Sequence, residues 1–223
     1  MALPWKTLEK VSTRDGELEL RQRGPTEFHI TRGGLVLMNS SARRSEEALG
    51  SMACAPFTSH RAPRALVAGL GLGFTLKAML DTLPASARVT VAELNSVVVD
   101  WCRGPLAALT DSSLSDPRVT VEVTDVNNVI GRAADDQASR FDAIVLDLYE
   151  GPHARSDKRD DPFYGSVAIS RMKRALNPGG VLAVWGEAHD EGYERRLGLS
   201  GFKVSRHRPG KGGLRHVVYM SRS

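Results

Sequence analysis

The sequence predicts an α/β protein with a mostly parallel sheet that carries helices on both faces. Short segments rich in β-branched residues alternate with segments of helical periodicity along most of the chain. One of these strands, residues 64–71, is almost entirely apolar, as expected for a strand buried on both faces. The two ends of the chain break the alternation and are typical of antiparallel strands. At 223 residues, the chain is long enough for one main domain and a small addition.

The N-terminal region is expected to form that addition. Residues 15–38 predict antiparallel strands with turns at Gly24–Pro25 and Gly33–Gly34, because glycine and proline favour tight turns. A helix is predicted over residues 45–53. We interpret residues 1–55 as a small cap of β-strands and a helix, followed by the main domain over residues 56–223.

The main domain is expected to alternate strands with helices. The predicted strands cover residues 64–71, 87–94, 117–125, 141–149 and 179–186. The predicted helices between them cover residues 75–83, 96–109, 126–134 and 164–176. The chain then ends in a predicted hairpin of residues 202–208 and 214–222. An antiparallel last strand argues against an NAD-type sheet, which is mostly parallel throughout, and favours the sheet of S-adenosylmethionine-dependent transferases.

Composition excludes several classes of protein. With 41% hydrophobic and 25% charged residues, the chain has the balance of a soluble globular protein. Its longest apolar runs, such as residues 180–185, are far shorter than the roughly 20 residues of a membrane-spanning helix, so no membrane association is expected. The N-terminus lacks the pattern of a secretory signal, which predicts a cytoplasmic location.

Charge and cysteine content exclude further functions. The net charge of +4 is modest, and its densest stretch, Lys203–Arg215, lacks interleaved aromatic residues, so a solvated basic face is favoured over nucleic-acid binding. Cys54 and Cys102 show neither CxxC spacing nor a histidine-rich partner segment. We therefore expect neither a disulfide nor a metal site.

A glycine-rich turn follows the first strand of the main domain. Gly69, Gly71 and Gly73 lie between that strand and the next helix, where backbone N–H groups can approach a ligand closely. Phe74 stands where the dinucleotide fingerprint requires glycine or alanine. This difference favours a ligand without a pyrophosphate, such as an S-adenosylmethionine-type nucleoside, although glycine turns also join strands to helices without binding anything.

Three acidic residues end successive strands at the same predicted sheet edge. Glu93 lies about 20 residues after the glycine loop, where a carboxylate can accept the hydroxyl protons of a ribose. Asp125 either lies beside an adenine or acts only as the N-cap of the next helix. Asp147 follows four apolar residues, where an acid is costly unless it has a partner or a function.

Together with the glycine loop, these acids resemble the spermidine synthase (polyamine aminopropyltransferase) family and its methyltransferase relatives. Residues 160–185, DDPFYGSVAISRMKRALNPGGVLAVW, are the most similar segment, and residues 45–53 resemble the segment that carries the family's HE pair. The resemblance implies a doubly wound, seven-stranded Rossmann-like sheet with a nucleotide-binding, catalytic role, and a homodimer. It makes Glu93 the ribose acid, Asp125 the acid beside adenine, and Asp147 the catalytic acid at the start of the gating loop.

The departures from the family pattern concern the substrates. The family's GGGDGG loop carries an acid that helps to hold the ammonium group of decarboxylated S-adenosylmethionine, and no acid occurs between Gly69 and Phe74. Arg44 and Ser45 replace the family's tyrosine-histidine pair ahead of Glu46. The cations Arg43 and Arg44 are unfavourable beside a diamine. These differences suggest that the sulfonium-nucleoside site is retained and that the putrescine site is lost.

The leading hypothesis is therefore transfer of a methyl group from S-adenosylmethionine to an amine, another small nucleophile or a peptide. The alternative is aminopropyl transfer from decarboxylated S-adenosylmethionine to a polyamine, and the third is a nucleotide-binding protein without catalysis. In either transfer, Asp147 would orient the attacking amine and stabilise its developing charge. Tyr149 could hydrogen-bond the nucleophile or merely cover the core. Residues 154–161 form either a lid or an idle charged loop.

Overall fold

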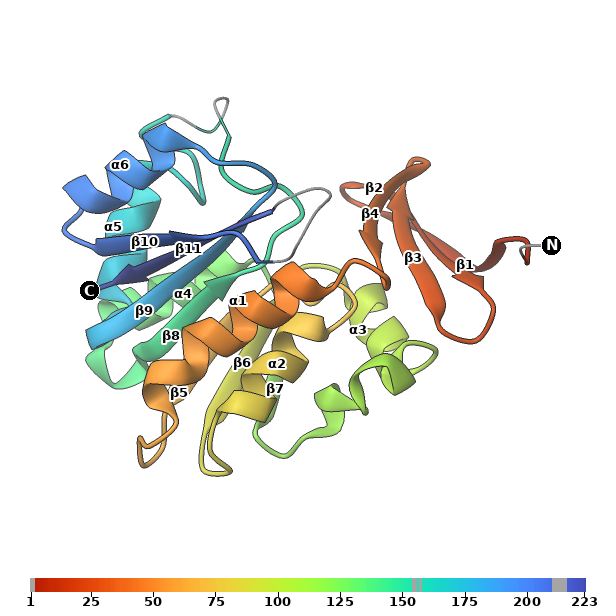
Figure 1. Cartoon of the computed structure of the whole chain (residues 1–223), viewed down its shortest axis with the longest axis horizontal. Helices are drawn as coiled ribbons and strands as arrows, with labels where there is room; N and C mark the ends of the chain where they lie inside the picture. The colour runs from red at the N-terminus through yellow and green to blue at the C-terminus, as the bar shows by residue number, and fades with distance from the viewer. Residues whose placement is uncertain (1–2, 154–155, 157, 210–215) are drawn as a thin grey trace.

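Alternating strands and helices form the main body of the molecule, and a separate small sheet lies at the N-terminal end (Figure 1). The computed structural model describes residues 3–153, 156, 158–209 and 216–223. The predicted hairpin turn around residues 210–215 and residues 154, 155 and 157 of the predicted lid lie outside the described residues.

The main sheet has seven strands in the order β10-β11-β9-β8-β5-β6-β7. Strands β5 to β9 pair in parallel, and β10 and β11 pair antiparallel at one edge. The prediction of a mostly parallel sheet with an antiparallel C-terminal hairpin is therefore confirmed. The bounds are β5 (Arg64–Ala68), β6 (Arg88–Glu93), β7 (Val119–Val123), β8 (Phe141–Leu146), β9 (Leu176–Gly186), β10 (Lys203–His207) and β11 (Val217–Arg222).

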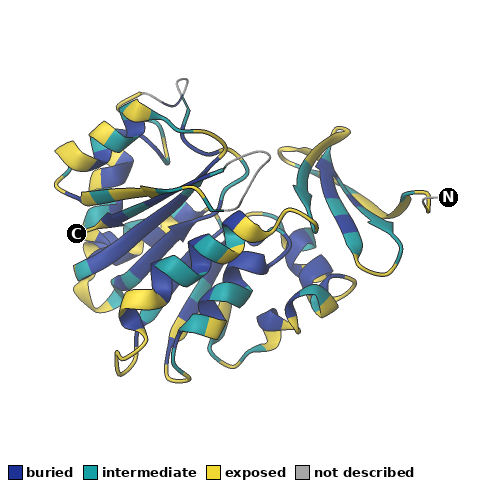
Figure 2. Ribbon diagram, viewed as in Figure 1, coloured by how far each residue is buried: buried dark blue, intermediate teal, exposed yellow. Residues whose placement is uncertain are grey.

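Helices cover both faces of this sheet (Figure 1), as a doubly wound fold requires. Alternate residues of each central strand belong to opposite halves of the core: Val67 packs with the first group of helices and Leu66 with the second. Figure 2 shows these central strands as the most buried part of the chain. The first group is α1 (Arg44–Cys54), α2 (Phe74–Thr82) and α3 (Ser96–Arg103), and the second is α4 (Val126–Asp135), α5 (Ser166–Arg174) and α6 (Glu191–Leu199).

Several boundaries differ from the sequence predictions. The predicted helix over residues 96–109 ends at Arg103, because Gly104 and Pro105 follow it, and the chain continues into a 3-10 helix. Strand β8 ends at Leu146 rather than at residue 149, which places Asp147 in the loop at the sheet edge. Helix α6 was not predicted. The 3-10 helices cover Ala55–Phe57, Ala107–Thr110, Ser113–Ser115 and Gln137–Ser139.

The N-terminal sheet contains one strand more than its turns predicted. Its antiparallel strands, in sequence order, are β1 (Lys6–Thr13), β2 (Gly16–Arg23), β3 (Glu27–Arg32) and β4 (Leu35–Asn39). One face of the sheet packs against the main domain, because Leu20, Phe28 and Ile30 are buried in the same core as α3. Trp101 on α3 also donates its indole N–H to Glu9 Oε2 on β1 at 2.6 Å.

The helix of the predicted cap packs against the main domain. Helix α1 contacts α2 and the strands β8, β9 and β11, and in Figure 1 it lies on the front of the main sheet. The division at residue 55 stays a prediction. None of the helices in the described part of the chain is long and apolar enough to span a membrane.

Candidate active site

The candidate site lies where the strand order of the main sheet reverses. The chain runs outward from β5 to β6 and β7 on one side, and from β8 to β9 on the other. Ligands of open α/β sheets bind at such a crevice, outside the carboxyl ends of the strands. Gly69 follows β5 and Asp147 follows β8, so these two residues meet at the reversal.

The contact between Gly69 and Asp147 is very close. Gly69 has a φ of +82°, and a Cβ atom on it would lie 2.4 Å from the backbone carbonyl oxygen of Asp147. A side chain would therefore collide with the neighbouring strand end, and the backbone conformation also favours glycine. The glycine allows the loop after β5 to lie directly against the residue that carries the candidate catalytic acid.

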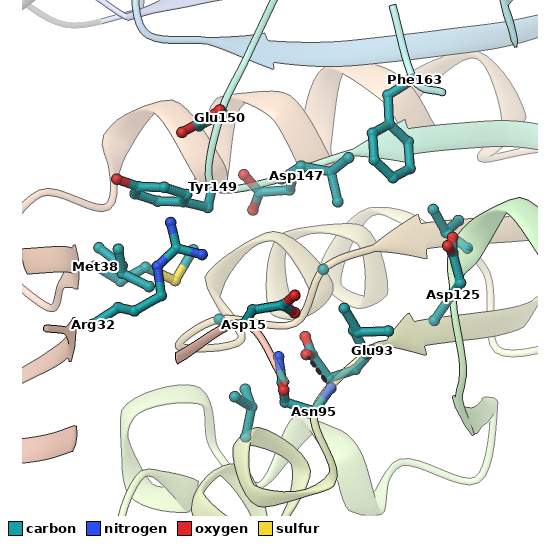
Figure 3. A pocket seen from close by; sticks show the side chains of 18 of the residues that line it. Asp15, Arg32, Met38, Glu93, Asn95, Asp125, Asp147, Tyr149, Glu150 and Phe163 are labelled. Carbon is teal, nitrogen blue, oxygen red and sulfur yellow. Dashed lines mark hydrogen bonds between the residues drawn. The ribbon is translucent and has the colours of Figure 1, made fainter. Parts of the chain in front are cut away.

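A first cavity of about 520 Å³ opens at this edge of the sheet. In Figure 3, the acidic residues Asp15, Glu93 and Asp147 lie around the same space. Of the predicted site residues, Gly73 is not among the described residues that line this cavity; it lies at the start of α2, as its N-cap. The others all line it: Gly69, Gly71, Glu93, Asp125, Asp147 and Tyr149.

Glu93 connects the glycine loop to the end of β6. It is buried, and its Oε2 accepts a hydrogen bond from the Leu70 backbone N–H at 2.9 Å. Its Oε1 accepts from the Asn95 backbone N–H, also at 2.9 Å. Burial raises the pKa of Glu93, while these backbone hydrogen bonds act in the opposite direction. Because each carboxylate oxygen can accept more than one hydrogen bond, Glu93 retains capacity for ligand hydroxyl groups.

Asp125 has the structural role that the sequence left open. It is the N-cap of α4, and its Oδ1 accepts from the Asn127 backbone N–H at 2.8 Å. Asp125 is also exposed at the rim of the first cavity. The capping role is therefore present in the structure, and a contact with adenine stays a prediction.

Asp147 is a buried carboxyl group beside a second acid. The Thr75 hydroxyl donates to Asp147 Oδ2 at 2.5 Å. Burial, followed by the charge of Glu46 on α1, raises the pKa of Asp147 to about 7. Burial also raises the pKa of Glu46. Asp147 can therefore gain or lose a proton near neutral pH, as a general base or acid must.

Tyr149 belongs to the wall of the site and contacts the N-terminal sheet. Its ring is half-buried, and the Arg32 guanidinium on β3 lies 4.8 Å from the ring centroid. Tyr149 and Arg32 lie next to each other in Figure 3, and both line the first cavity. Cation–π contacts of this kind fix the orientation of both side chains. No described hydrogen bond shows Tyr149 acting on a nucleophile, so that role stays a prediction.

The N-terminal sheet contributes side chains that the sequence analysis did not identify. Asp15 and Arg32 line the first cavity, and Met38 lines it from β4 (Figure 3). The Met38 thioether lies directly on the glycine loop, since a Cβ atom on Gly71 would be 2.1 Å from its sulfur. Nothing in the spacing of these residues identifies them, because the contact depends on how the two sheets pack.

A second cavity, of about 980 Å³, meets the first at Met38, Asp147 and Tyr149. Carboxylate side chains surround the second cavity, and they come from α1, from the loops after β8 and β9, and from the start of α6. They are Glu46, Asp147, Glu150, Glu187, Asp190 and Glu191. The arrangement gives this cavity a strongly acidic wall, which favours a cationic ligand.

The two arginines that argued against an amine ligand do not contribute to this cavity. Among the described residues, neither Arg43 nor Arg44 lines it. Arg43 pairs with Glu47 at 3.1 Å, and its guanidinium lies 5.6 Å from the centroid of the Phe74 ring. Neither arginine therefore places its charge in the wall of the second cavity, and the loss of a diamine site stays a prediction.

The predicted lid is only partly described. Ser156 and Asp161 line the first cavity. Asp161 Oδ1 also accepts hydrogen bonds from the backbone N–H groups of Phe163 and Tyr164, at 3.0 Å and 2.7 Å. The described part of this segment thus forms one wall of the cavity, and its opening and closing stay a prediction.

Comparisons with known proteins agree with the sequence resemblance. No family model matches the chain. It is 36% identical to the polyamine aminopropyltransferase of Nitrosomonas europaea over 132 residues, which are 58% of this chain and 37% of that protein. It is 28% identical to the polyamine aminopropyltransferase of Mycobacterium tuberculosis over 172 residues, which are 75% of this chain and 30% of that protein. The chain thus spans about a third of the length of these curated relatives.

Solved structures show the same fold over almost the whole chain. A spermidine synthase from Thermotoga maritima has a TM-score of 0.75 and 16% identity, and covers 97% of this chain and 72% of its own. A spermidine synthase in complex with the transition-state analogue AdoDATO has a TM-score of 0.73 and 15% identity, with the same coverage. A probable spermidine synthase from Corynebacterium glutamicum has a TM-score of 0.68 and 18% identity, with 97% and 79% covered.

Proposed function

Since the chain is spermidine-synthase-like in sequence and in fold, we propose that it transfers an aminopropyl group from decarboxylated S-adenosylmethionine to an amine. The observation that supports this most strongly is the junction of the two cavities at Asp147. One cavity has the features of a nucleoside site and the other has an acidic wall. A donor and a cationic acceptor could therefore meet at one buried carboxyl group.

The first cavity is the proposed donor site. Glu93 would accept the ribose hydroxyl groups, and the loop of Gly69, Gly71 and Gly73 would bring backbone N–H groups close to the nucleoside. Asp125 would lie at the adenine end, because it follows the strand beyond β6. The AdoDATO complex of a structural neighbour supports a donor of this type.

Two other acids lie close to the place of the acid that the family's glycine loop carries and this chain lacks. The uncharged Leu72 lies in the glycine loop of this chain. Glu46 and Asp147 line the same small recess as Leu72. Burial and then the charge of Glu46 raise the pKa of Asp147, and a cation between the two carboxyl groups would stabilise their ionised forms. We infer that the ammonium group of the donor's aminopropyl chain binds to these two acids instead of to a loop acid.

The second cavity is the proposed acceptor site. Its acids would attract a protonated amine, and Asp147 would orient the nitrogen that attacks the carbon next to sulfur. An amine must lose a proton before it attacks, and a carboxylate with a pKa of about 7 is suited to take that proton. As the sulfonium is already activated, alignment and exclusion of water supply most of the remaining catalysis.

Methyl transfer from S-adenosylmethionine is the second candidate. The curated relatives do not support it, since they are polyamine aminopropyltransferases. One feature of the site favours it: Arg32 lines the first cavity, where a guanidinium could bind the carboxylate that S-adenosylmethionine has and the decarboxylated donor lacks.

Product analysis with each donor tests the proposal. The protein would be incubated with decarboxylated S-adenosylmethionine or S-adenosylmethionine and a panel of diamines and polyamines, and the products analysed by mass spectrometry. We expect the mass of an added aminopropyl group with the first donor only. Added methyl groups would establish the second candidate. Binding of methylthioadenosine without any product would instead indicate a protein that binds nucleosides and does not catalyse transfer.

A further inference from the structure

Strand β4 leads from the junction of the two cavities into the second cavity. All of its residues, Leu35–Asn39, line the second cavity. Met38 also lines the first cavity and the small recess that contains Asp147, whereas Leu35 lines neither. Because a strand rises about 3.3 Å per residue, Leu35 lies about 10 Å along β4 from Met38. The strand therefore extends from the proposed reacting centre outward along the proposed acceptor site.

The outer part of β4 presents apolar side chains to the second cavity. Leu35 is 58% exposed and Val36 is 45% exposed, and β4 is an edge strand of the N-terminal sheet (Figure 1). The ring of Trp185 on β9 also lines this cavity. It lies 4.8 Å from the His216 ring in an edge contact, and His216 Nδ1 lies 3.0 Å from the Ser45 hydroxyl oxygen. Exposed apolar side chains beside a ligand cavity are typical of a binding surface.

Several acids of the second cavity already have partners within the chain. Asp190 is the N-cap of α6, and its Oδ1 accepts from the Tyr193 backbone N–H at 2.6 Å. Glu150 Oε2 lies 3.6 Å from His153 Nε2. Glu191 is in the first turn of α6, where the helix dipole favours a negative charge. These interactions account for part of the acidic wall without a second ammonium group on the ligand.

The acids at the junction are in a different environment. Burial raises the pKa of both Asp147 and Glu46, so their ionised forms are costly without a cation nearby. Both carboxyl groups line the inner end of the second cavity, beside the recess that they share with Met38. The greatest stabilisation by a ligand cation is therefore expected at the junction.

The volume of the second cavity exceeds the needs of a small diamine. Its value of about 980 Å³ is at the upper end of the roughly 300–1,000 Å³ that is usual for pockets of drug-sized ligands. A short linear diamine has few atoms and would leave most of this space to water. The cavity has room for a larger body beyond the reacting nitrogen.

We propose that the acceptor is a primary amine on an apolar body, such as an arylalkylamine, with its nitrogen at Asp147 and its body along Leu35 and Val36. This inference rests on the proposed function and narrows its acceptor class. The amine nitrogen forms a bond to the aminopropyl carbon, and the carbon–sulfur bond breaks with both electrons staying on sulfur. One N–H proton passes to Asp147 and then to water. The acidic junction and the apolar strand match the two ends of such an amine.

Two amines of the same chain length test the acceptor class without turnover. 4-Phenylbutylamine and butane-1,4-diamine share a four-carbon chain and differ in whether it ends in a ring or in a second ammonium group. Calorimetry on the protein saturated with methylthioadenosine measures both affinities. We expect 4-phenylbutylamine to bind at least 10-fold more tightly, with a negative heat-capacity change from apolar burial. Tighter binding of the diamine would overturn the proposal.

Substitutions on β4 test where the apolar body lies. Leu35→Ser and Val36→Ser should each weaken the binding of 4-phenylbutylamine about 5-fold, because apolar contact area is lost, and leave the affinity for butane-1,4-diamine within 2-fold. Unchanged binding of methylthioadenosine shows that each variant is folded. Equal losses for the two amines, or no loss for either, would overturn the contact with β4.

Matched controls come from exposed apolar residues elsewhere on the surface. Val167 on α5 is 44% exposed and Leu199 at the end of α6 is 82% exposed. Neither is among the described residues that line the two cavities. Val167→Ser and Leu199→Ser should therefore leave both amine affinities unchanged. A loss in these controls equal to that of the β4 variants would also overturn the assignment.

Turnover separates this inference from the proposed function. With decarboxylated S-adenosylmethionine, mass spectrometry should show aminopropylated 4-phenylbutylamine, and the β4 variants should raise its KM and leave kcat within 2-fold. If the diamine binds more tightly and is the better substrate, the proposed function stands and this inference is wrong. If no amine gives product, the proposed function fails, and the calorimetric comparison still decides which class of amine the cavity binds.

Discussion

The two cavities that meet at Asp147 are built in different ways. The first includes the strand ends and the glycine loop, where Gly69 and Glu93 occupy positions set by the main sheet. The second is formed by side chains from α1, from the loops after β8 and β9, and from the segment before β11. The main sheet thus positions the residues proposed to hold the donor, whereas side chains from helices and loops form the acidic wall of the proposed acceptor site.

This difference explains why donor and acceptor were not equally predictable. The strand-end position of Glu93 follows from alternation and spacing, and any chain with this fold repeats it. The acids of the second cavity come from three separate stretches of the chain, and no pattern in the sequence joins them. Substitutions in the first cavity, and at Asp147 between the two cavities, should therefore affect donor binding and turnover to different extents.

The largest effect is expected at the junction. Asp147→Asn should lower turnover at least 100-fold, in line with the usual contribution of a positioned acid or base, because an amide cannot take up the proton of the amine. Affinity for methylthioadenosine, which has no ammonium group for Asp147 to bind, should stay within a few-fold, since the first cavity keeps its shape. Steady-state kinetics and calorimetry with methylthioadenosine measure the two quantities, and turnover near the wild-type value would exclude Asp147 from the reaction.

The wild-type pH profile gives an independent check of the same group. Because the pKa of Asp147 is raised to about 7, the basic form is lost as pH falls through 7. We expect kcat to decline on the acid side of this value. An acid limb that persists unchanged in a low-activity Asp147→Asn protein would have to arise from another group.

The next largest effect should be confined to the first cavity. Glu93→Ala should weaken donor binding by about 2 kcal/mol, roughly the value of a charged hydrogen bond, because the ribose and the Leu70 N–H lose their acceptor. Glu122→Ala is the matched control, because Glu122 is on the adjacent strand β7 and pairs with Arg132 instead of lining the cavity. Equal calorimetric affinities for the two variants would remove Glu93 from the site.

A smaller effect is expected where the N-terminal sheet meets the glycine loop. Gly71→Ala should reduce donor affinity about 10-fold, because its Cβ would overlap the Met38 thioether and its φ of +52° is unfavourable for alanine. Adding Met38→Ala should remove the overlap and leave the backbone strain, so affinity should recover in part. Full recovery would mean that strain in the loop is unimportant, and no recovery would mean that Met38 is not the obstacle.

The smallest effect concerns stability. The pKa of Asp147 is higher in the folded chain than in the unfolded chain, so the folded state loses stability as pH rises through this interval. At pH 8, Asp147→Asn should therefore raise the melting temperature by about 2–4 °C, which corresponds to roughly 1 kcal/mol for a chain of this size. Below pH 4 the gain should disappear.

The control for this measurement is Asp125→Asn. Asparagine caps a helix about as well as aspartate does, and Asp125 is exposed, so its replacement should give no gain at pH 8. A gain of the same size in both variants would point to net charge rather than to the burial of Asp147.

Much of the fold and part of the site were predictable from the sequence. The β-branched strands and glycine turns predicted the parallel sheet and its antiparallel end, and the chain positions of Glu93 and Asp147 placed them at one sheet edge. Strand β1 was missed because Lys6–Thr13 alternates polar and charged residues with little apolar content. Helix α6 was missed because it buries only Tyr193 and Leu197.

The rest of the site depends on tertiary packing. Arg43 and Arg44 are next to Glu46 in sequence, and this adjacency suggested cations in the acceptor site. On a helix, neighbouring residues point in different directions, so the Glu46 carboxylate faces inward while Arg43 pairs with Glu47. The contacts of Met38 with the glycine loop and of His216 with Ser45 join segments that no local pattern connects.

The contact between Gly69 and Asp147 has a consequence for how such a site can change. The backbone of Asp147 packs directly against Gly69, which has no side chain. The distance between Asp147 and the glycine loop therefore depends on the absence of a Cβ atom at position 69. A single methyl group added at position 69 would push apart the ends of β5 and β8. The reacting groups could then lose their spacing while every functional side chain remained in the protein.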